Sequence, residues 1–450
     1  MQSFEVEARS IEFVPTAERY GGPKRLFTIW FSANLSIVCA SVGALGVIAG
    51  LSLPWTVLGL LIGNGIGTIF MAAHSAQGPH LGVPQMIQSR AQFGVLGAAV
   101  PLVAVIVTYI LYTAADGLVV ENTLAHLLGC APETALILFG LITLVIAYVG
   151  YELIHRIAAV LAIASAALFI FVSYRYWTAP PVSIPAPGGF NRAIFLATVT
   201  QAAAWSLSYG PYVADYSRYL RPTIATSTTF WYTASGCFLG ASATMAFGAY
   251  LASIDPRLSG DLGAAIVQVA PAGSSLIIVL GVLIGNVMNV YSAYMSSATI
   301  FAGFARMSRL SWSTKLLTMV LVTALATAIA WVAEGHFGQY FGDILAIMAY
   351  LLIPWSAINL ADYYIVRKGQ YEIADLYNLD GVYGRVRTRT LMAYTIGILA
   401  EAPFMRLTVY EGLIAQSINV DLAWAVGLMV SGLLYVLLER NALSGLRTPA

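Results

Sequence analysis

The sequence contains few charged residues. Of its 450 residues only 10% are charged and 59% are hydrophobic, whereas a soluble domain averages about 25% charged and about 45–50% apolar. The 22 lysines and arginines balance 21 acidic residues, for a net charge of +1, which gives no electrostatic basis for binding nucleic acid. Since a chain of this length cannot enclose so much apolar surface, we expect a lipid bilayer to cover much of it.

Cysteine and histidine are also scarce. The three cysteines lie in or beside apolar runs without CxxC spacing, which favours buried thiols over a redox or metal site. The five histidines lie at expected helix ends or in loops without ligand spacing. This argues against an enzyme with a metal cluster, and no cofactor is expected. A channel would need a continuous polar stripe and charged rings, and only scattered Ser, Asn and Tyr occur.

Long apolar runs are abundant. A membrane-spanning helix needs about 20 apolar residues, and the sequence predicts twelve such spans: 27–51, 55–76, 97–121, 134–153, 155–174, 192–214, 229–252, 274–303, 315–333, 338–359, 390–412 and 421–440. A very short turn is expected near Glu152–Arg156. With both termini in the cytoplasm, 18 of the 22 basic residues fall on the cytoplasmic side, as the positive-inside rule requires.

Two of the predicted spans look interrupted. The first, 27–51, contains Asn34 and several serines before Gly43, Gly46 and Gly50; the sixth, 192–214, contains Gly210–Pro211. Transporters with inverted repeats place such breaks at corresponding positions of two halves. A glycine packing face and an ordinary proline kink are the alternative.

The offset between these breaks predicts a repeat of five spans followed by five. The expected division is a cytoplasmic segment 1–26, a first repeat 27–174, a second repeat 192–359, a cytoplasmic loop 360–389, two final spans within 390–440 and a tail 441–450.

Two loops are longer than turns. Residues 77–96 are semipolar, and we expect a short helix there on the cytoplasmic side. Residues 360–389 carry five basic residues and five interspersed tyrosines, a combination that favours anchoring at the lipid headgroups. Regulatory lipid binding is the alternative.

Six stretches carry a resemblance to a known family: WFSAN (30–34), Gly82 through SRAQFG (89–94), ADYSRYL (214–220), NVYS (289–292), PWSAINLADYYIVRKGQY (354–371) and LDGVYG (379–384). The sequence resembles the nucleobase–cation symporters, which include cytosine, purine, uracil, allantoin and hydantoin transporters, and is most similar to the purine–cytosine permease branch. The resemblance implies an all-α membrane protein with the leucine-transporter fold, in which substrate and cation lie between the first, third, sixth and eighth spans. It further implies import of a cytosine- or purine-like ring by cation symport across the cell membrane; an allantoin-, hydantoin- or uracil-type ring, or another small solute, is the alternative.

A planar nucleobase needs aromatic rings to stack on and polar groups to read its edge. In the third span Tyr109, Tyr112 and Asp116 share one helical face. The two tyrosines match positions where the bacterial cytosine transporter has glutamine and tryptophan, which weakens a specific claim for cytosine. The other substrate candidates are Trp205, which aligns with the family's stacking aromatic, Ser206, Asn286, Asn289, Ser36 and Ser41. Ordinary packing or interhelical hydrogen bonding is the alternative for each.

Asp116 is the one carboxylate well inside a predicted span, and intramembrane acids are functional candidates. It could carry a coupling proton or fix a neighbouring tyrosine; exposure at a helix end toward the outer leaflet is the alternative. Asp215 and Arg218 belong to the DYSRY stretch and are expected to form a cytoplasmic ion pair or gate.

The resemblance leaves the coupling cation open. Sodium-coupled relatives use backbone carbonyls of the broken first span and hydroxyls of the eighth. Ser36, Val38 and Ser292 are candidates for a cation site here, but Val287 and Met288 occupy the aligned hydroxyl positions and cannot ligate sodium. A proton is therefore favoured over sodium.

Overall fold

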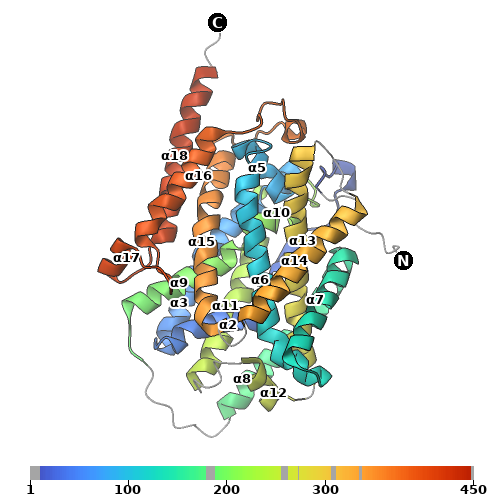
Figure 1. Ribbon diagram of the computed structural model, residues 1–450, viewed down its shortest axis with the longest axis vertical. Coiled ribbons are helices and arrows are strands. Elements are labelled where there is room, and N and C mark those ends of the chain that lie inside the picture. The colour runs from blue at the N-terminus through green and yellow to red at the C-terminus, as the bar shows by residue number, and fades with distance from the viewer. Residues whose placement is uncertain are drawn as a thin grey trace.

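The apolar runs fold into helices that lie side by side along one direction (Figure 1). The computed structural model describes residues 11–149, 151–178, 188–254, 262–271, 273–305, 311–333 and 337–446, and within these ranges it has no strand beyond one isolated bridge between Arg406 and Glu411. The short elements are the 3-10 turns η1 (Thr16–Glu18), η4 (Ile373–Tyr377) and η5 (Ala402–Phe404), and the π turn η3 (Asp362–Val366). The α-helices are α1 (Lys24–Ala33), α2 (Ile37–Ile48), α3 (Leu53–Ser75), α4 (Gly78–Leu81), α5 (Gln85–Phe93), α6 (Ala99–Leu128), α7 (Pro132–Val149), α8 (Tyr151–Thr178), α9 (Arg192–Leu207), α10 (Gly210–Ser217), α11 (Thr226–Ile254), α12 (Leu262–Val269), α13 (Ser274–Ala305), α14 (Trp312–Ala333), α15 (Phe337–Ala361), α16 (Thr388–Glu401), α17 (Leu413–Ile418) and α18 (Ala423–Leu446).

The described helices have the length and composition of membrane spans. Seven of them are long and apolar enough to cross a bilayer, and the bent pair α1–α2 makes an eighth. Large apolar side chains on α7 and α14 face outward, among them Val145 and Val332, which are 62% and 85% exposed. Such surfaces are stable only against lipid, so the predicted membrane protein is confirmed. The count of twelve spans, their grouping into repeats and the assigned sidedness stay predictions.

The structure confirms both expected helix breaks. Helices α1 and α2 are bent by 60° around residues 34–36, which rules out an unbroken helix with a glycine face. In the second break α9 ends at Leu207 and α10 begins at Gly210, with Pro211 in its first turn. Proline at that position lacks only an N–H that would have no partner within the helix, so the break leaves little backbone unsatisfied.

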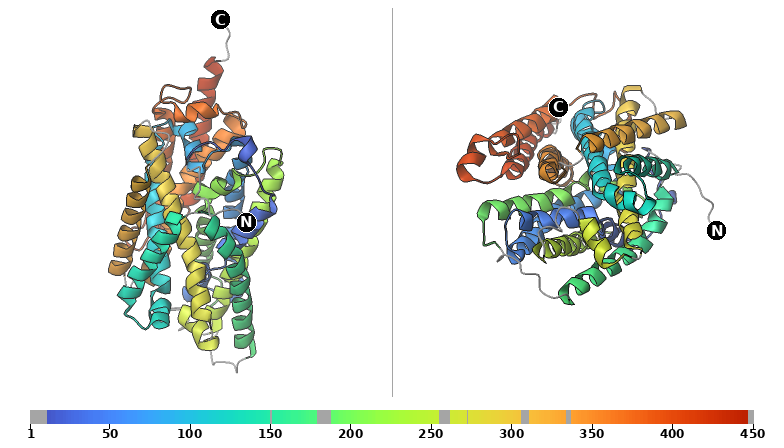
Figure 2. Two further views of the ribbon diagram at one scale, coloured as in Figure 1. Left: turned by 90° about the vertical axis from the view of Figure 1, so that its right-hand side faces the viewer. Right: turned by 60° about the horizontal axis from the view of Figure 1, so that its bottom comes forward.

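Two expected boundaries are wrong. Residues 152–156 are helical, because α7 ends at Val149 and α8 begins at Tyr151. The span predicted over 390–412 ends at Glu401, followed by η5 and a loop in which Arg406 pairs with Glu411; Pro403 cannot donate the hydrogen bond that would continue the helix. Helices α16 and α18 pack on each other and on α15, at one side of the molecule (Figure 2).

The loop predicted over 77–96 does contain a helix, but that helix is internal. All nine residues of α5 are buried. Arg90 is 2% exposed and donates from Nη1 to the Leu376 carbonyl at 3.0 Å and from Nη2 to the Thr299 carbonyl at 2.6 Å. Burial lowers the pKa of Arg90 to about 10, so the guanidinium remains charged at neutral pH and fastens α5 to α13 and η4.

The segment 360–389 lies at the same end of the molecule as α5 (Figure 1). Its tyrosines mostly pack on protein, which contradicts the predicted anchoring at headgroups. Tyr363 and Tyr383 are 5% and 2% exposed, and the Tyr377 hydroxyl donates to the Ile11 carbonyl at 2.7 Å. Of the five, only Tyr364 is exposed. The segment is a folded cap over the end of the helices, which composition alone does not distinguish from an interfacial anchor.

Glycines let neighbouring helices approach closely. A methyl group on Gly43 of α2 would lie 1.9 Å from the Met245 carbonyl oxygen of α11, far inside van der Waals contact. We therefore expect Gly43→Ala to separate these helices and to destabilise the protein by about 1–3 kcal/mol or more, which a thermal unfolding curve of the purified protein measures. Gly22→Ala is the matched control, since nothing lies within 4 Å of its added methyl group. Equal melting temperatures for the two variants would contradict the packing.

Candidate functional site

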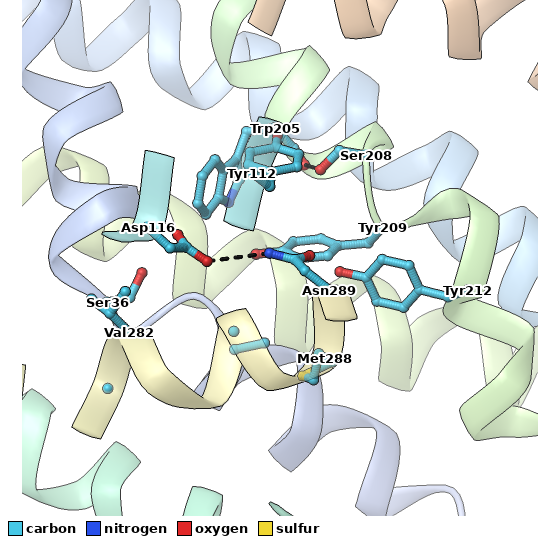
Figure 3. A pocket seen from close by; sticks show the side chains of 13 residues that line it. Ser36, Tyr112, Asp116, Trp205, Ser208, Tyr209, Tyr212, Val282, Met288 and Asn289 are labelled. Carbon is cyan, nitrogen blue, oxygen red and sulfur yellow. Dashed lines mark hydrogen bonds between the residues drawn. The ribbon is translucent and has the colours of Figure 1, made fainter. Parts of the chain in front are cut away.

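A cavity lies where the two broken spans meet α6 and α13 (Figure 3). It is small, about 40 Å³, which is room for about three water molecules. Its lining residues come from both breaks and from the facing sides of α6 and α13: Ala33, Ser36, Tyr112, Asp116, Trp205, Ser208, Tyr209, Tyr212, Gly281, Val282, Gly285, Met288 and Asn289.

The structure brings five of the predicted site residues together around this cavity: Ser36, Tyr112, Asp116, Trp205 and Asn289. They come from four segments that are far apart in the sequence. The first, third, sixth and eighth predicted spans therefore do converge on one place, as the resemblance implied.

Four other predicted site residues are absent from the lining. Ser206 donates to Asn64 Oδ1 on α3 at 3.2 Å, and Ser41 donates to the Ile37 carbonyl of its own helix at 3.0 Å. Asn286 donates to Thr143 Oγ1 on α7 at 3.0 Å. Tyr109 is 1% exposed and packs against Tyr212 with ring centroids 5.4 Å apart. Ser206, Asn286 and Tyr109 thus hold helices together around the site, whereas Ser41 bonds only within α2.

The sequence reasoning missed Ser208, Tyr209, Tyr212 and Met288. The two tyrosines were detectable, because Tyr209, Tyr212 and Tyr216 recur at three and four residues beside the expected Gly210–Pro211 break. Met288, which the resemblance aligned with a sodium-ligating hydroxyl that a methionine cannot replace, lines the cavity.

Aromatic rings form one wall of the cavity. Tyr112 meets Trp205 edge-on at 5.8 Å and 89°, Trp205 meets Tyr209 at 6.0 Å and 83°, and Tyr209 meets Tyr212 at 5.9 Å and 84°. Edge-to-face contacts of this kind are favourable because a positive ring edge faces a negative ring face. These contacts fix the orientation of the rings in this wall, so that their π faces are available to stack on a planar ligand.

Polar groups complete the lining. Asn289 Nδ2 donates to Asp116 Oδ2 at 3.2 Å, drawn as the dashed line in Figure 3. Asp116 is 6% exposed. Ser208 Oγ donates to the Trp205 carbonyl at 2.6 Å, and Ser36 Oγ accepts from the Cys39 N–H at 3.3 Å, which caps α2. A carboxylate, an amide and hydroxyls beside aromatic rings suit a ring with donors and acceptors on its edge.

The residues considered for a cation site are not brought together around the cavity. Val287 is buried at 1% exposure, and Met288 offers a thioether rather than a hard oxygen. Val38 and Ser292 do not line the cavity, and the Ser36 hydroxyl already caps α2. Among the residues that the structure describes, no group of three or more His, Cys, Asp or Glu side chains could hold a metal ion. The cation site stays a prediction.

Asp215 and Arg218 lie on and just after α10, away from the cavity. Asp215 Oδ1 accepts from the Gln85 backbone N–H at 2.8 Å and so caps the start of α5. Arg218 Nη1 donates to the Glu12 carbonyl at 3.3 Å. Both residues thus fasten the second break to the buried helix α5 and to the N-terminal segment. Their role in a gate stays a prediction.

Asn286 and Asn289 lie one turn apart on α13, but the structure gives them different partners. We expect Asn289→Ala to weaken ligand binding by about tenfold, because it removes the amide that lies in the cavity and holds Asp116. Asn286→Ala is the matched control and should leave affinity within about twofold, since that amide bonds to Thr143. Direct binding to the two purified variants measures both values. Equal losses of affinity in the two variants would contradict the placement of Asn289, rather than Asn286, in the binding site.

The fold and this central cavity are those of a multi-pass membrane transporter. Residues 13–427 match the family described as permease for cytosine/purines, uracil, thiamine, allantoin, and the chain belongs to that family. It is a permease, not an enzyme.

Individual relatives agree with this assignment. The chain is 37% identical over 444 residues to a putative purine-cytosine permease of Bacillus subtilis, covering 97% of each sequence. It is 25% identical over 408 residues to a purine-cytosine permease of Saccharomyces cerevisiae, covering 82% of this chain and 74% of the other. Among solved structures it shares the fold of a nucleobase-cation-symport-1 family transporter in a closed conformation with bromovinylhydantoin bound, with a TM-score of 0.78 at 17% identity and coverage of 98% and 97%. These relatives support the purine–cytosine branch.

Proposed function

We propose that the protein imports a nucleobase of the cytosine or purine type across the cell membrane, with both termini in the cytoplasm. The observation that carries this proposal is the pairing of Asp116 with Asn289 opposite the rings of Tyr112 and Trp205. A nucleobase would stack on the aromatic wall, and its edge would meet the carboxylate and the amide.

The size of the cavity supports alternating access as part of this proposal. At about 40 Å³ it has room for about three water molecules, so the residues that line it would have to move apart to admit a planar ring. The two helix breaks supply the places where backbone can rotate without disrupting a continuous helix.

Proton coupling is the form of symport that the lining favours. Asp116 is the one carboxylate among the lining residues, and Val287 and Met288 offer no hydroxyl for sodium. A proton on Asp116 would remove a charge that is costly to carry through the membrane interior. The substrate and the proton would then occupy adjacent positions and move together. Sodium is the alternative, with Ser36, Val38 and Ser292 as its candidate ligands.

An allantoin-, hydantoin- or uracil-type ring is the second candidate. Such rings also present alternating N–H and carbonyl groups, and the matched family covers uracil and allantoin. The polar lining of Asp116, Asn289 and Ser208 does not by itself distinguish these edges.

Uptake by cells that express the chain tests the proposal. Excess unlabelled cytosine, adenine, hypoxanthine, uracil, allantoin and hydantoin would compete against labelled cytosine and adenine, with and without sodium and with a protonophore. We expect cytosine or a purine to compete most strongly, and uptake to continue without sodium and to stop with the protonophore. Strongest competition by allantoin or hydantoin would contradict the substrate, and a strict sodium requirement would contradict the coupling.

A further inference from the structure

Asn34 occupies the break in the first span without lining the cavity. It follows the last residue of α1, is fully buried, and is absent from the cavity lining. An asparagine amide has two donor hydrogens and an acceptor oxygen with two lone pairs. The partners of that amide are therefore informative about what the residue does.

The oxygen of this amide faces the second break. Trp205 Nε1–H donates to Asn34 Oδ1 at 2.7 Å, and the Tyr209 hydroxyl donates to the same oxygen at 3.4 Å. Trp205 lies in the last turn of α9, and Tyr209 is the N-cap residue of α10. One oxygen atom thus bonds to two rings that flank the second break.

The nitrogen of the amide is fixed from the other side. Asn34 Nδ2 donates to the Trp30 carbonyl of α1 at 2.6 Å and approaches Cys237 Sγ of α11 at 3.8 Å. Helix α11 lies directly behind, where a methyl group on Gly240 would meet the Asn34 Cβ at 3.2 Å. The amide therefore cannot rotate or retreat without losing bonds or colliding with α11.

Both rings held by Asn34 belong to the aromatic wall of the site. The hydrogen bond from the indole N–H to Asn34 restricts rotation of the Trp205 side chain about its torsion angles and so fixes the angle of the ring face to a planar ligand. The same bond commits the indole N–H to protein, which leaves Trp205 to contact a substrate through its π surface alone.

We propose that Asn34 is a positioning residue for substrate binding, which orients Trp205 and Tyr209 through its amide oxygen and ties the two helix breaks to each other. The consequence for affinity rests on the proposed function; the consequence for the geometry of Trp205 does not. The near-isosteric Asn34→Leu removes the acceptor at similar volume, and Asn34→Asp keeps an oxygen at the same place.

A double-mutant cycle tests the role in affinity. Asn34→Leu should weaken binding of labelled cytosine or adenine about tenfold in the otherwise wild-type protein. In a Trp205→Phe, Tyr209→Phe background, which has no donors to the amide oxygen, the same change should cost less than about twofold. Asn34→Asp should recover most of the affinity, because its buried carboxyl, when protonated, offers one oxygen to Trp205 and an O–H to the Trp30 carbonyl. Full additivity of Asn34→Leu with the two aromatic changes would overturn the proposal, because a general structural defect would act in either background.

A spectroscopic measurement tests the geometry without any substrate. In protein labelled with 5-fluorotryptophan, the fluorine resonance that disappears in Trp205→Phe belongs to Trp205. We expect that resonance to shift and broaden in Asn34→Leu and to keep its position in Asn34→Asp; an unchanged resonance in Asn34→Leu would overturn the proposal. If the wild-type protein binds no ring at all, the proposed function fails, and the resonance still decides whether Asn34 holds Trp205.

Discussion

Asp116→Asn is expected to abolish accumulation of substrate against a gradient while leaving exchange across the membrane intact. The amide has nearly the shape of the carboxylic acid and can still bond to Asn289, but it cannot bind and release a proton. One proton crossing 100 mV supplies about 2.3 kcal/mol, enough for about 50-fold accumulation of a coupled solute. We expect the variant to lose that accumulation entirely, so that internal and external substrate concentrations become equal.

The measurement compares net uptake with counterflow in the same proteoliposomes. Counterflow needs only binding and alternating access, whereas accumulation needs coupling. Glu133→Gln is the control, since this carboxylate is exposed at the start of α7 and should change neither rate. Undiminished accumulation in Asp116→Asn would exclude Asp116 as the proton carrier and would make sodium the favoured coupling ion.

The second large effect is expected just after the C-terminal end of α15, where Asp362 is fully buried. Its carboxylate accepts four hydrogen bonds. Oδ2 accepts from Gln92 Nε2 of α5 at 2.7 Å and from the Tyr371 hydroxyl at 2.6 Å. Oδ1 accepts from the Tyr435 hydroxyl of α18 at 2.6 Å and from Arg367 Nε at 3.0 Å.

The amides of the same region extend this arrangement toward α3. Asn359 Nδ2 donates to Gln92 Oε1 at 3.3 Å, and Gln77 Nε2 donates to Asn359 Oδ1 at 3.0 Å. A chain of buried side chains thus joins the start of α4, α5, the end of α15 and α18, at the end of the molecule that we propose to be cytoplasmic. Asp362 supplies the only formal negative charge in that chain of side chains.

Asp362→Ala should therefore destabilise the protein by about 3–5 kcal/mol, because Arg367 would lose its buried partner and three polar side chains would lose an acceptor. Thermal unfolding of the purified variant, or its yield in the membrane, measures the loss. The matched control is Asp380→Ala, which removes an exposed partner of Arg385 and should cost less than about 1 kcal/mol. Similar melting temperatures for the two variants would contradict this role of the Asp362 carboxylate.

The sequence predicted the location of most helices because lipid imposes a strong constraint on length and apolarity. It also predicted both breaks, since Gly210–Pro211 and the polar run around Asn34 are costly in an unbroken membrane helix. The end of α16 was wrong by about three turns, because the apolar residues after Pro403 continue the hydropathy signal although the helix stops there.

The sequence could not predict how each helix is rotated about its own axis. Asn286 and Asn289 are one turn apart with the same chemistry, and only the contact of Asn286 with Thr143 on α7 shows which of them is turned from the cavity. Tyr109 and Tyr112 pose the same problem on α6. The bond from Trp205 to Asn34 joins residues 171 positions apart, and no local pattern encodes such a pair. Composition likewise did not show that α5 is buried or that most tyrosines of the 360–389 segment pack on protein.

Counterflow with the purified protein in proteoliposomes tests the central claim most directly, because it requires binding and translocation but no particular coupling ion. Vesicles loaded with unlabelled cytosine or adenine would be diluted into a trace of the labelled compound, with wild-type protein and with Trp205→Ala. We predict a saturable transient accumulation of label in the wild type and its loss in Trp205→Ala, which removes the largest ring of the aromatic wall. Absence of counterflow for cytosine, purines, uracil, allantoin and hydantoin alike would contradict the assignment of this cavity to a nucleobase-like ring.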